Sequence, residues 1–249
     1  MNNLGKEVPI PLYYQIKARL LEAMENGQLK PGDRVMSERE LTAQFGVSRM
    51  TARQALIELE NQGYLYRVQG KGTFVSTPKL EQPLAGLTSF TEDMRRRGLE
   101  PGARVLAARE TVAGRRVARA LGIGEAASVY QLERLRLAGG EPMALESAHV
   151  PAALVPGLLE SGHMEHSLYR ILRERYDIHL VRATQSLEAV AANLYEAEML
   201  HVKEGTPLLL LERVARDTAD RPIEFVRSLY RGDRYRFTTE LIRREEVPS

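Results

Sequence analysis

The sequence has no cysteine among its 249 residues. This absence excludes disulfide bonds, thiolate nucleophiles and cysteine-ligated zinc. Long apolar runs are also absent: no stretch approaches the ~18 residues that a helix needs to cross a bilayer, and the N-terminal MNNLGKEVPIPLYY lacks the apolar centre of a signal peptide. We therefore expect a soluble protein in the cytoplasm.

Catalytic motifs are missing as well. The chain shows no nucleophile constellation, no GxGxxG fingerprint and no phosphate-binding P-loop. His163 and His166 form an H-x-x-H pair in a predicted loop, but no third or fourth metal ligand is evident near them. The sequence thus predicts a protein that is not an enzyme and that holds neither a metal nor a cofactor.

The length and composition fit two ordinary folded domains. Hydrophobic residues make up 43% and charged residues 27%, which is enough apolar side chain for real cores and gives no sign of bulk disorder. The net charge of +2 lies entirely in the first part, because residues 1–78 carry ten basic and eight acidic side chains and the remainder carries 25 of each. This excess is too small to indicate nucleic-acid binding by itself, so the argument depends on where the charges stand.

Three helices are predicted in the first 63 residues. Apolar residues recur at helical spacing over 12–24. Ser37 and Glu40 fit the reciprocal capping box that begins a second helix. After a short turn, Ser48 is a good N-cap for a third helix that continues to Gly63. The second and third helices together predict a helix-turn-helix.

The first two turns of the third helix carry side chains suited to DNA: Ser48, Arg49, Thr51 and Arg53. An arginine can donate two hydrogen bonds to guanine, and the amides at a helix N-terminus can hold a phosphate oxygen. A solvated helix face is the alternative interpretation, but it leaves Arg49 and Arg53 as an unfavourable like-charged pair four residues apart. We therefore favour a recognition helix.

Two short strand-like runs, YLYRVQ and TFVS, follow this helix and are joined by Gly70-Lys71-Gly72. A hairpin with a glycine tip and a cation can lie along the phosphate backbone or enter the minor groove, where a bulky tip would clash. The segment predicts the wing of a winged helix-turn-helix, with Lys71 at a phosphate.

This N-terminal segment resembles the DNA-binding domain of the GntR family of bacterial transcription regulators. The likeness runs through PLYYQIKARL and PGDRVMSERELTAQFGVSRMTARQALIELENQGYLYRVQGKGTFV. The resemblance implies that the residues at the matching positions contact operator DNA, namely Arg39, Ser48, Arg49, Thr51, Arg53 and Gly70. Met50 stands at a more variable position, where it would tune base preference.

Residues 76–86, STPKLEQPLAG, contain two prolines and no periodic pattern. We interpret them as a linker between a DNA-binding domain at 1–75 and a second domain at 87–249. Helices are predicted at 90–97, 115–121, 166–176 and 193–200, and strands at 103–112, 128–138, 143–150, 178–190, 207–217 and 222–231. Because strands outnumber helices and several are adjacent, an α+β fold with an antiparallel sheet and packed helices is favoured over a doubly wound parallel sheet.

Three segments of the second domain resemble the UTRA effector domain of the HutC subfamily: LTSFTEDMRRRGLEPG, VYQLERLRLAGGEPMALE and PIEFVRSLYRGDRYRF. The resemblance implies a fold similar to chorismate lyase, a small-molecule effector and dimer contacts in this domain. Within the subfamily, these segments are similar to regulators of N-acetylglucosamine utilisation. The expected effector is therefore N-acetylglucosamine 6-phosphate or glucosamine 6-phosphate.

The second domain also contains a candidate anion site. Arg134 and Arg136 stand two apart on a predicted strand, so both side chains leave one face and can converge on a single phosphate. Ser89 and Thr91 flank Phe90 at a predicted helix start, where hydroxyls and amides could complete the cradle. An exposed sheet face with solvated arginines is the alternative interpretation, and the family resemblance favours the anion site.

Two carboxylates, Glu146 and Glu224, stand in strand-like runs that are otherwise apolar. Their carboxylates can accept hydrogen bonds from sugar hydroxyls. The alternative is an internal salt bridge to the two arginines. Both interpretations can apply, the salt bridge in the empty site and the sugar contacts when a ligand is bound. Ser167, Tyr169 and Tyr230 would supply further hydroxyls to an effector.

The favoured function is a metabolite-responsive repressor that binds a palindromic operator as a homodimer and is released from it by a sugar phosphate. A small carboxylate or a phosphonate-related compound is an alternative effector. Two functions of other classes remain open: a lyase-like enzyme fused to a DNA-binding domain, and a DNA-architectural protein without a ligand. Binding of sugar phosphates without turnover would support the repressor, and turnover would support the enzyme.

Overall fold

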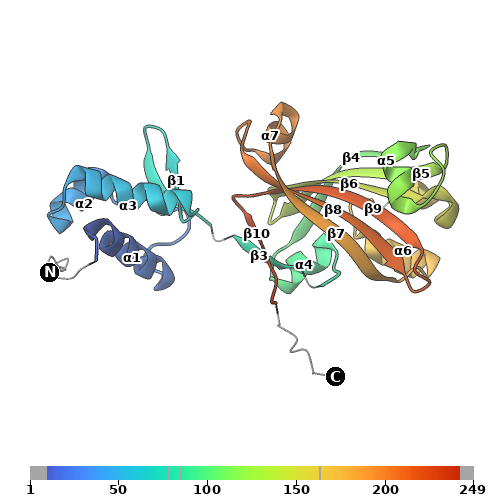
Figure 1. Ribbon diagram of the computed structural model, residues 1–249, viewed down its shortest axis with the longest axis horizontal. Helices are drawn as coiled ribbons and strands as arrows, with labels where there is room; N and C mark the ends of the chain where they lie inside the picture. Colours follow the sequence, from blue (N-terminus) through green and yellow to red (C-terminus); the bar gives the residue numbers. More distant parts are fainter. Residues whose placement is uncertain (1–9, 78, 85, 163, 242–249) are drawn as a thin grey trace, which may run out of the picture. The chain divides into compact units, whose positions relative to one another are not determined.

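The computed structural model describes residues 10–77, 79–84, 86–162 and 164–241. The chain divides into two compact units, 1–79 and 80–249, called here the N-terminal and the C-terminal unit. Each is described by itself (Figure 1).

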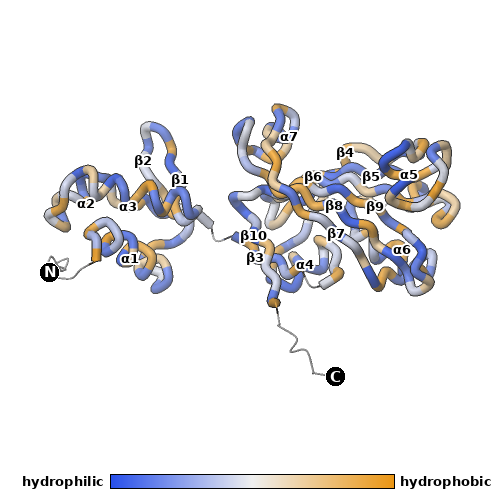
Figure 2. Tube along the Cα trace, viewed as in Figure 1, coloured by the Kyte–Doolittle hydropathy of each residue, from blue (hydrophilic) through white to orange (hydrophobic). Residues whose placement is uncertain are grey.

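The N-terminal unit contains the three predicted helices α1 (Leu12–Glu25), α2 (Glu38–Phe45) and α3 (Arg49–Asn61). Ser37 and Glu40 form the predicted capping box of α2, in which the Ser37 amide donates to Glu40 Oε2 at 2.6 Å. Hydrophobic and hydrophilic residues alternate along α1 and α3 (Figure 2). The apolar faces pack into one core, in which Ile16, Leu41 and Leu59 are completely buried.

The predicted wing is an antiparallel hairpin of β1 (Leu65–Val68) and β2 (Gly72–Val75). Gly70 in the turn has φ 74°, a left-handed conformation that costs glycine little. Gly72 has φ 122°, and a Cβ atom there would lie 3.0 Å from Nε of Arg34. Glycine at this position therefore lets Arg34 approach the wing closely.

The C-terminal unit is built on a six-stranded sheet in the order β4-β5-β6-β9-β8-β7, in which all neighbours are antiparallel. The strands are β4 (Pro101–Val112), β5 (Ser128–Ala138), β6 (Glu141–Pro151), β7 (Leu180–Ala191), β8 (Pro207–Asp217) and β9 (Pro222–Arg231). The helices are α4 (Phe90–Arg96), α5 (Gly114–Leu121), α6 (Leu168–Tyr176) and α7 (Leu194–Leu200), with the short 3-10 helices η1 (Ala152–Leu154) and η2 (Leu158–Ser161). The predicted α+β fold with an antiparallel sheet is confirmed. Within the described residues, none of the helices has both the length and the apolar character that crossing a membrane requires.

Part of the predicted linker, residues 76–86, forms regular secondary structure. Its residues Leu80–Pro83 form β3, which pairs in parallel with β10 (Tyr235–Thr238) near the end of the described chain. Neither strand was predicted from the sequence. Each has only four residues, and each depends on a partner about 150 residues away, which no local pattern reveals.

The two faces of the sheet are covered by different helices. On β5, Leu132 belongs to the buried cluster that includes α6, whereas Val129 packs with α5 and Leu135 with α7. Side chains two apart on a strand share a face. Arg134 and Arg136 therefore point to the face covered by α6, as Leu132 does.

Candidate functional site

The start of α3 is a capped helix terminus. Ser48 Oγ accepts the Thr51 amide at 3.1 Å and lies 2.8 Å from Thr51 Oγ1. These two predicted DNA contacts thus also fix the local helix start. Arg49 and Arg53 are exposed on the same helix, and Arg49 Nε donates to Glu38 Oε2 at 3.1 Å.

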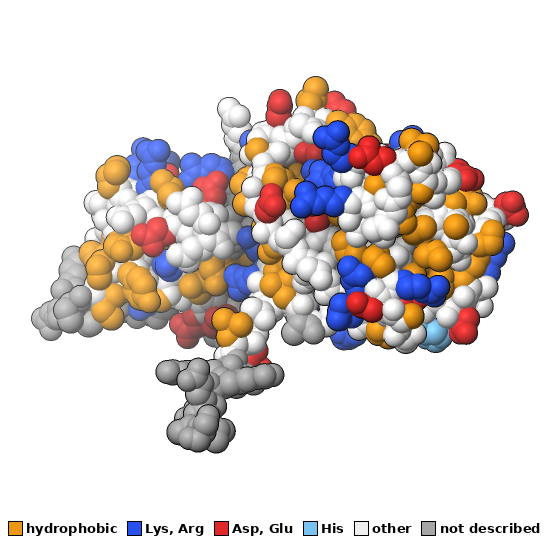
Figure 3. Space-filling model, turned by 45° about the vertical axis from the view of Figure 1, so that its right-hand side comes forward, with side chains coloured by type: hydrophobic (Ala, Val, Ile, Leu, Met, Phe, Trp, Pro, Cys, Tyr) orange, Lys and Arg blue, Asp and Glu red, His pale blue; other side chains and the backbone are white. Residues whose placement is uncertain are grey.

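A hollow lies between the start of α3 and the wing, and cationic side chains line it. They are Arg34, Arg39, Arg49 and Arg67, with Gly70 at the wing tip. Figure 3 shows Lys and Arg side chains gathered along the upper edge of this unit. Arg34 and Arg67 were not among the predicted contacts, although both stand beside segments that were predicted to reach DNA.

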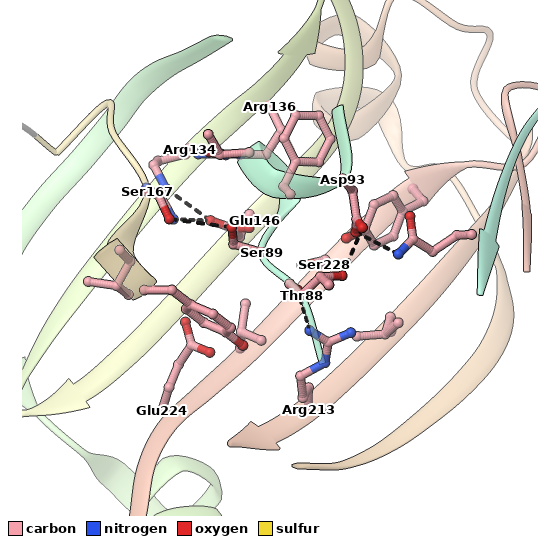
Figure 4. Close-up of a pocket in the computed structure, with 18 of the residues that line it drawn as sticks. Thr88, Ser89, Asp93, Arg134, Arg136, Glu146, Ser167, Arg213, Glu224 and Ser228 are labelled. Atoms are coloured by element: carbon pink, nitrogen blue, oxygen red, sulfur yellow. Dashed lines mark hydrogen bonds and ion pairs between the residues drawn. The ribbon is translucent and has the colours of Figure 1, made fainter. Parts of the chain in front are cut away.

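The ten residues predicted to bind an effector all line one cavity in the C-terminal unit (Figure 4). They come from three strands and two helix starts: Ser89, Phe90, Thr91, Arg134, Arg136, Glu146, Ser167, Tyr169, Glu224 and Tyr230. The remaining lining residues were not predicted: Gln82, Thr88, Asp93, Leu168, Leu211, Arg213, Val226, Ser228 and Phe237. Segments up to 155 positions apart in sequence therefore form one site.

Arg134 is fully engaged by the protein itself. Its Nε donates to Glu146 Oε1 at 2.9 Å, and its Nη2 pairs with the same oxygen. Its Nη1 donates to the carbonyl oxygens of Met164 at 3.1 Å and His166 at 2.8 Å. The internal salt bridge considered for Glu146 is thus present. His163, the other member of the H-x-x-H pair, lies outside the described residues.

Arg136 differs from Arg134, two positions earlier on the same strand. The side chain is only 2% exposed, and its guanidinium lies 4.7 Å from the centre of the Phe90 ring. Nη2 donates to Thr91 Oγ1 at 3.0 Å, but Nε and Nη1 have no hydrogen-bond partner among the described residues. Burial lowers the pKa of Arg136. A buried cation with spare donors is costly unless an anion joins it.

The two carboxylates have opposite protonation tendencies. Burial by itself raises the pKa of Glu146, but the guanidinium groups of Arg134 and Arg136 outweigh burial and hold the pKa below its ordinary value. Burial, followed by the negative charge of Glu146, raises the pKa of Glu224 to about 7. Glu146 is therefore ionised at neutral pH. Glu224, by contrast, is protonated at a higher pH than an ordinary glutamic acid.

The helix start that carries Ser89 is already occupied. The Ser89 amide donates to Glu92 Oε2 at 2.9 Å, and Ser89 Oγ accepts the Glu92 amide at 3.2 Å. Glu92 thus already holds the Ser89 amide, which was predicted to be available to a phosphate. Ser167 Oγ, which caps α6, donates to Ser89 Oγ at 3.4 Å.

Two charged residues that line the cavity, Asp93 and Arg213, were not predicted from the sequence. Asp93 accepts hydrogen bonds from Gln82 Nε2 at 2.6 Å and Thr88 Oγ1 at 2.8 Å. Arg213 Nε and Nη2 donate to Gln185, and its Nη1 donates to the carbonyl oxygen of Thr88. Arg213 interrupts an apolar strand in the same way as Glu146 and Glu224, so the same signal could have found it.

A winged helix-turn-helix joined in one chain to a separate domain with a buried, charged cavity is the organisation of a transcription regulator with a ligand-binding domain. Residues 12–75 match the bacterial regulatory proteins of the gntR family, and residues 96–236 match the UTRA domain. The chain belongs to the GntR family and, with its UTRA domain, to the HutC subfamily.

Two named relatives are similar in sequence to this chain over nearly its whole length. The HTH-type transcriptional repressor NagR of Bacillus subtilis (strain 168) is 46% identical over 94% of this chain and 96% of that protein. The HTH-type transcriptional repressor PhnF of Mycolicibacterium smegmatis is 39% identical over 92% of this chain and 93% of that protein. The crystal structure of PhnF from Mycobacterium smegmatis matches with a TM-score of 0.66 and 37% identity, covering 94% of this chain and 100% of that chain. The protein is thus a transcriptional repressor of the GntR/HutC type.

Proposed function

We propose that this repressor controls genes for the uptake and catabolism of amino sugars and leaves its operator when it binds N-acetylglucosamine 6-phosphate or glucosamine 6-phosphate. The observation that carries the effector class is Arg136, a buried guanidinium with two nitrogens that lack partners among the described residues. A phosphate supplies several strong acceptor oxygens to such a group. The 46% identity with NagR supports an amino sugar as the rest of the molecule.

The operator is bound by the winged helix-turn-helix of the N-terminal unit. The contacts we propose are Arg39, Ser48, Arg49, Thr51, Arg53, Gly70 and Lys71. The cationic hollow between α3 and the wing supports this assignment, because phosphates flank any groove that a recognition helix enters. The effector lowers operator affinity by favouring another spacing of the two winged helices in a dimer.

Calorimetry on the full chain tests the effector assignment. The two phosphorylated amino sugars and their unphosphorylated forms are titrated into the wild type, into Arg136→Met and into the control Arg115→Met. We expect the unphosphorylated sugars to bind far more weakly and Arg136→Met to lose roughly 10- to 150-fold in affinity for the phosphates, the range for hydrogen bonds to charged groups. Arg115 is 91% exposed on α5, so its variant should bind as the wild type does.

Two results would contradict the effector assignment: equal affinity for phosphorylated and unphosphorylated sugar, or undiminished binding to Arg136→Met. Arg134 is less suitable for this test. Its removal would leave the carboxylate of Glu146 buried without a partner, and that costs several kcal/mol of stability whatever the ligand.

A further inference from the structure

The cavity holds two buried side chains of opposite character that both have unused hydrogen-bonding atoms. Arg136 has Nε and Nη1 without partners, and Glu224 has Oε2 without a partner, in each case among the described residues. Both side chains are at least 97% buried. Figure 4 shows Arg136 on one side of the cavity and Glu224 on the other. A ligand between them would meet a donor at one end and an acceptor at the other.

The groups that face Glu224 do not satisfy it. Glu146 on β6 adds a like charge that raises the pKa of Glu224, the nearby Tyr169 hydroxyl of α6 lowers that pKa only slightly, and Oε2 has no hydrogen-bond partner among the described residues. The two nearby cations are Arg134 on β5 and Arg213 on β8.

Neither cation offers Glu224 a hydrogen bond, because each is committed elsewhere. Arg134 donates to Glu146 and to two carbonyl oxygens. Arg213 donates to the Gln185 side chain and to a carbonyl oxygen. Because burial and the charge of Glu146 raise the pKa of Glu224 to about 7, the neutral acid persists to a higher pH in the empty protein than an ordinary glutamic acid does. Among the described residues, the protein thus keeps one carboxyl that has cations nearby but accepts a hydrogen bond from neither of them.

We propose that Glu224 selects a ligand with a free amine, so that the cavity prefers an unacylated amino-sugar phosphate to its N-acyl form. The phosphate lies at Arg136, and the ammonium group lies at Glu224 Oε2. This inference rests on the proposed function, because the phosphate end positions the amine. An N-acetyl group carries no charge, so its amide can donate a single neutral hydrogen bond and leaves the ionised carboxylate uncompensated.

Ligand entry then has a defined proton balance. The ammonium ligand favours the ionised carboxylate, so molecules that carried Glu224 as an acid release its proton to solvent; no covalent bond to carbon forms or breaks. Binding of the amine therefore strengthens as the pH rises through about 7. Hydrolysis of the amide of an N-acylated amino-sugar phosphate is one class of reaction that would supply such an effector. The repressor would report that product rather than its precursor.

The test compares glucosamine 6-phosphate, N-acetylglucosamine 6-phosphate and glucose 6-phosphate on the full chain. Calorimetry in buffers of different ionisation enthalpy gives the number of protons released, and the phosphate group is common to all three probes. At about pH 6 we expect the amine to release close to one proton more than the other two sugars, and at about pH 8 far less. At pH 7.5 the amine should bind roughly tenfold or more tighter than glucose 6-phosphate.

The variant Glu224→Gln should bring that affinity ratio towards one and abolish the extra proton release. Glu188→Gln, an exposed glutamate on β7, is the matched control and should keep both. Equal proton release by the three sugars in the wild type overturns the inference without any variant, as does tighter binding of the N-acetyl sugar. Failure of all three phosphates to bind overturns the proposed function and the inference together.

Discussion

Arg134 and Arg136 show how two identical side chains on one strand acquire different roles. Both are almost completely buried, and a buried charge is tolerated only when it is paired and hydrogen-bonded. Arg134 has these partners in Glu146 and in two backbone carbonyls, whereas among the described residues Arg136 contacts only Thr91 Oγ1 and the face of Phe90 through its guanidinium. The first arginine therefore holds the cavity wall together, and the second has donors left for a ligand.

The raised pKa of Glu224 predicts that the free energy of unfolding depends on pH. Its pKa is about 7 in the folded protein and near 4.5 when unperturbed, so between these values the folded state holds a proton that the unfolded chain has lost. Stability from this group consequently falls as the pH rises from about 4.5 to 7 and stays low above. We expect Glu224→Gln to be more stable than the wild type by roughly 1–3 kcal/mol at pH 8, since one pKa unit corresponds to about 1.4 kcal/mol.

Thermal unfolding of the empty full chain at pH 5 and pH 8 measures this effect. The advantage of the variant should shrink at pH 5, where the folded wild type keeps the proton. A wild type that is the more stable of the two at pH 8 would contradict the raised pKa of Glu224.

The spacing of Arg134 and Arg136 was enough to predict that both reach one cavity, because a strand places alternate residues on one face. Two features of the site could not be predicted in this way. The engagement of Arg134 depends on carbonyls 30 and 32 positions away, and Asp93 and Gln82 meet only after β3 docks. Such contacts arise from chain crossings that leave no periodic trace in the sequence.

At the scale of elements, long strands were predicted better than short ones. The bounds of β5, β8 and β9 are those that alternation and apolar content predicted, since ten or eleven residues give a clear pattern. β3 and β10 give none. The omission matters because β3 carries Gln82, whose side chain donates to Asp93 in the cavity wall. The segment that leads to the N-terminal unit thus contacts the candidate effector site directly.

The recognition helix and the wing predict different effects on DNA binding. Arg53→Ala should cost roughly 1–3 kcal/mol on the operator and less on random DNA, because a base-reading arginine contributes specificity. Lys71→Ala should weaken binding to all sequences about equally and reduce the salt slope by about one unit, because a phosphate contact carries no sequence information. Titrations of the operator and of random DNA at several salt concentrations separate the two patterns.

An unchanged preference of Arg53→Ala for the operator would place the base-reading residues elsewhere. Arg49 is the next residue to examine, although it already donates to Glu38. Removing Arg49 also removes this ion pair, so its binding data need a stability measurement beside them. Arg53 is exposed on the same helix and gives the cleaner comparison.

At the scale of the whole molecule, one winged helix offers too small an interface for tight operator binding. Two linked copies turn the second contact into an intramolecular event, which multiplies affinity by about 10² to 10⁴ when the half-sites are suitably spaced. We therefore predict a symmetric homodimer held by the C-terminal unit and an operator with two inverted half-sites about one helical turn apart. Light scattering at micromolar concentration measures the first expectation, and footprinting measures the second. A chain that stays monomeric and protects a single half-site would contradict both, and it would also remove the spacing change by which an effector is proposed to release the DNA.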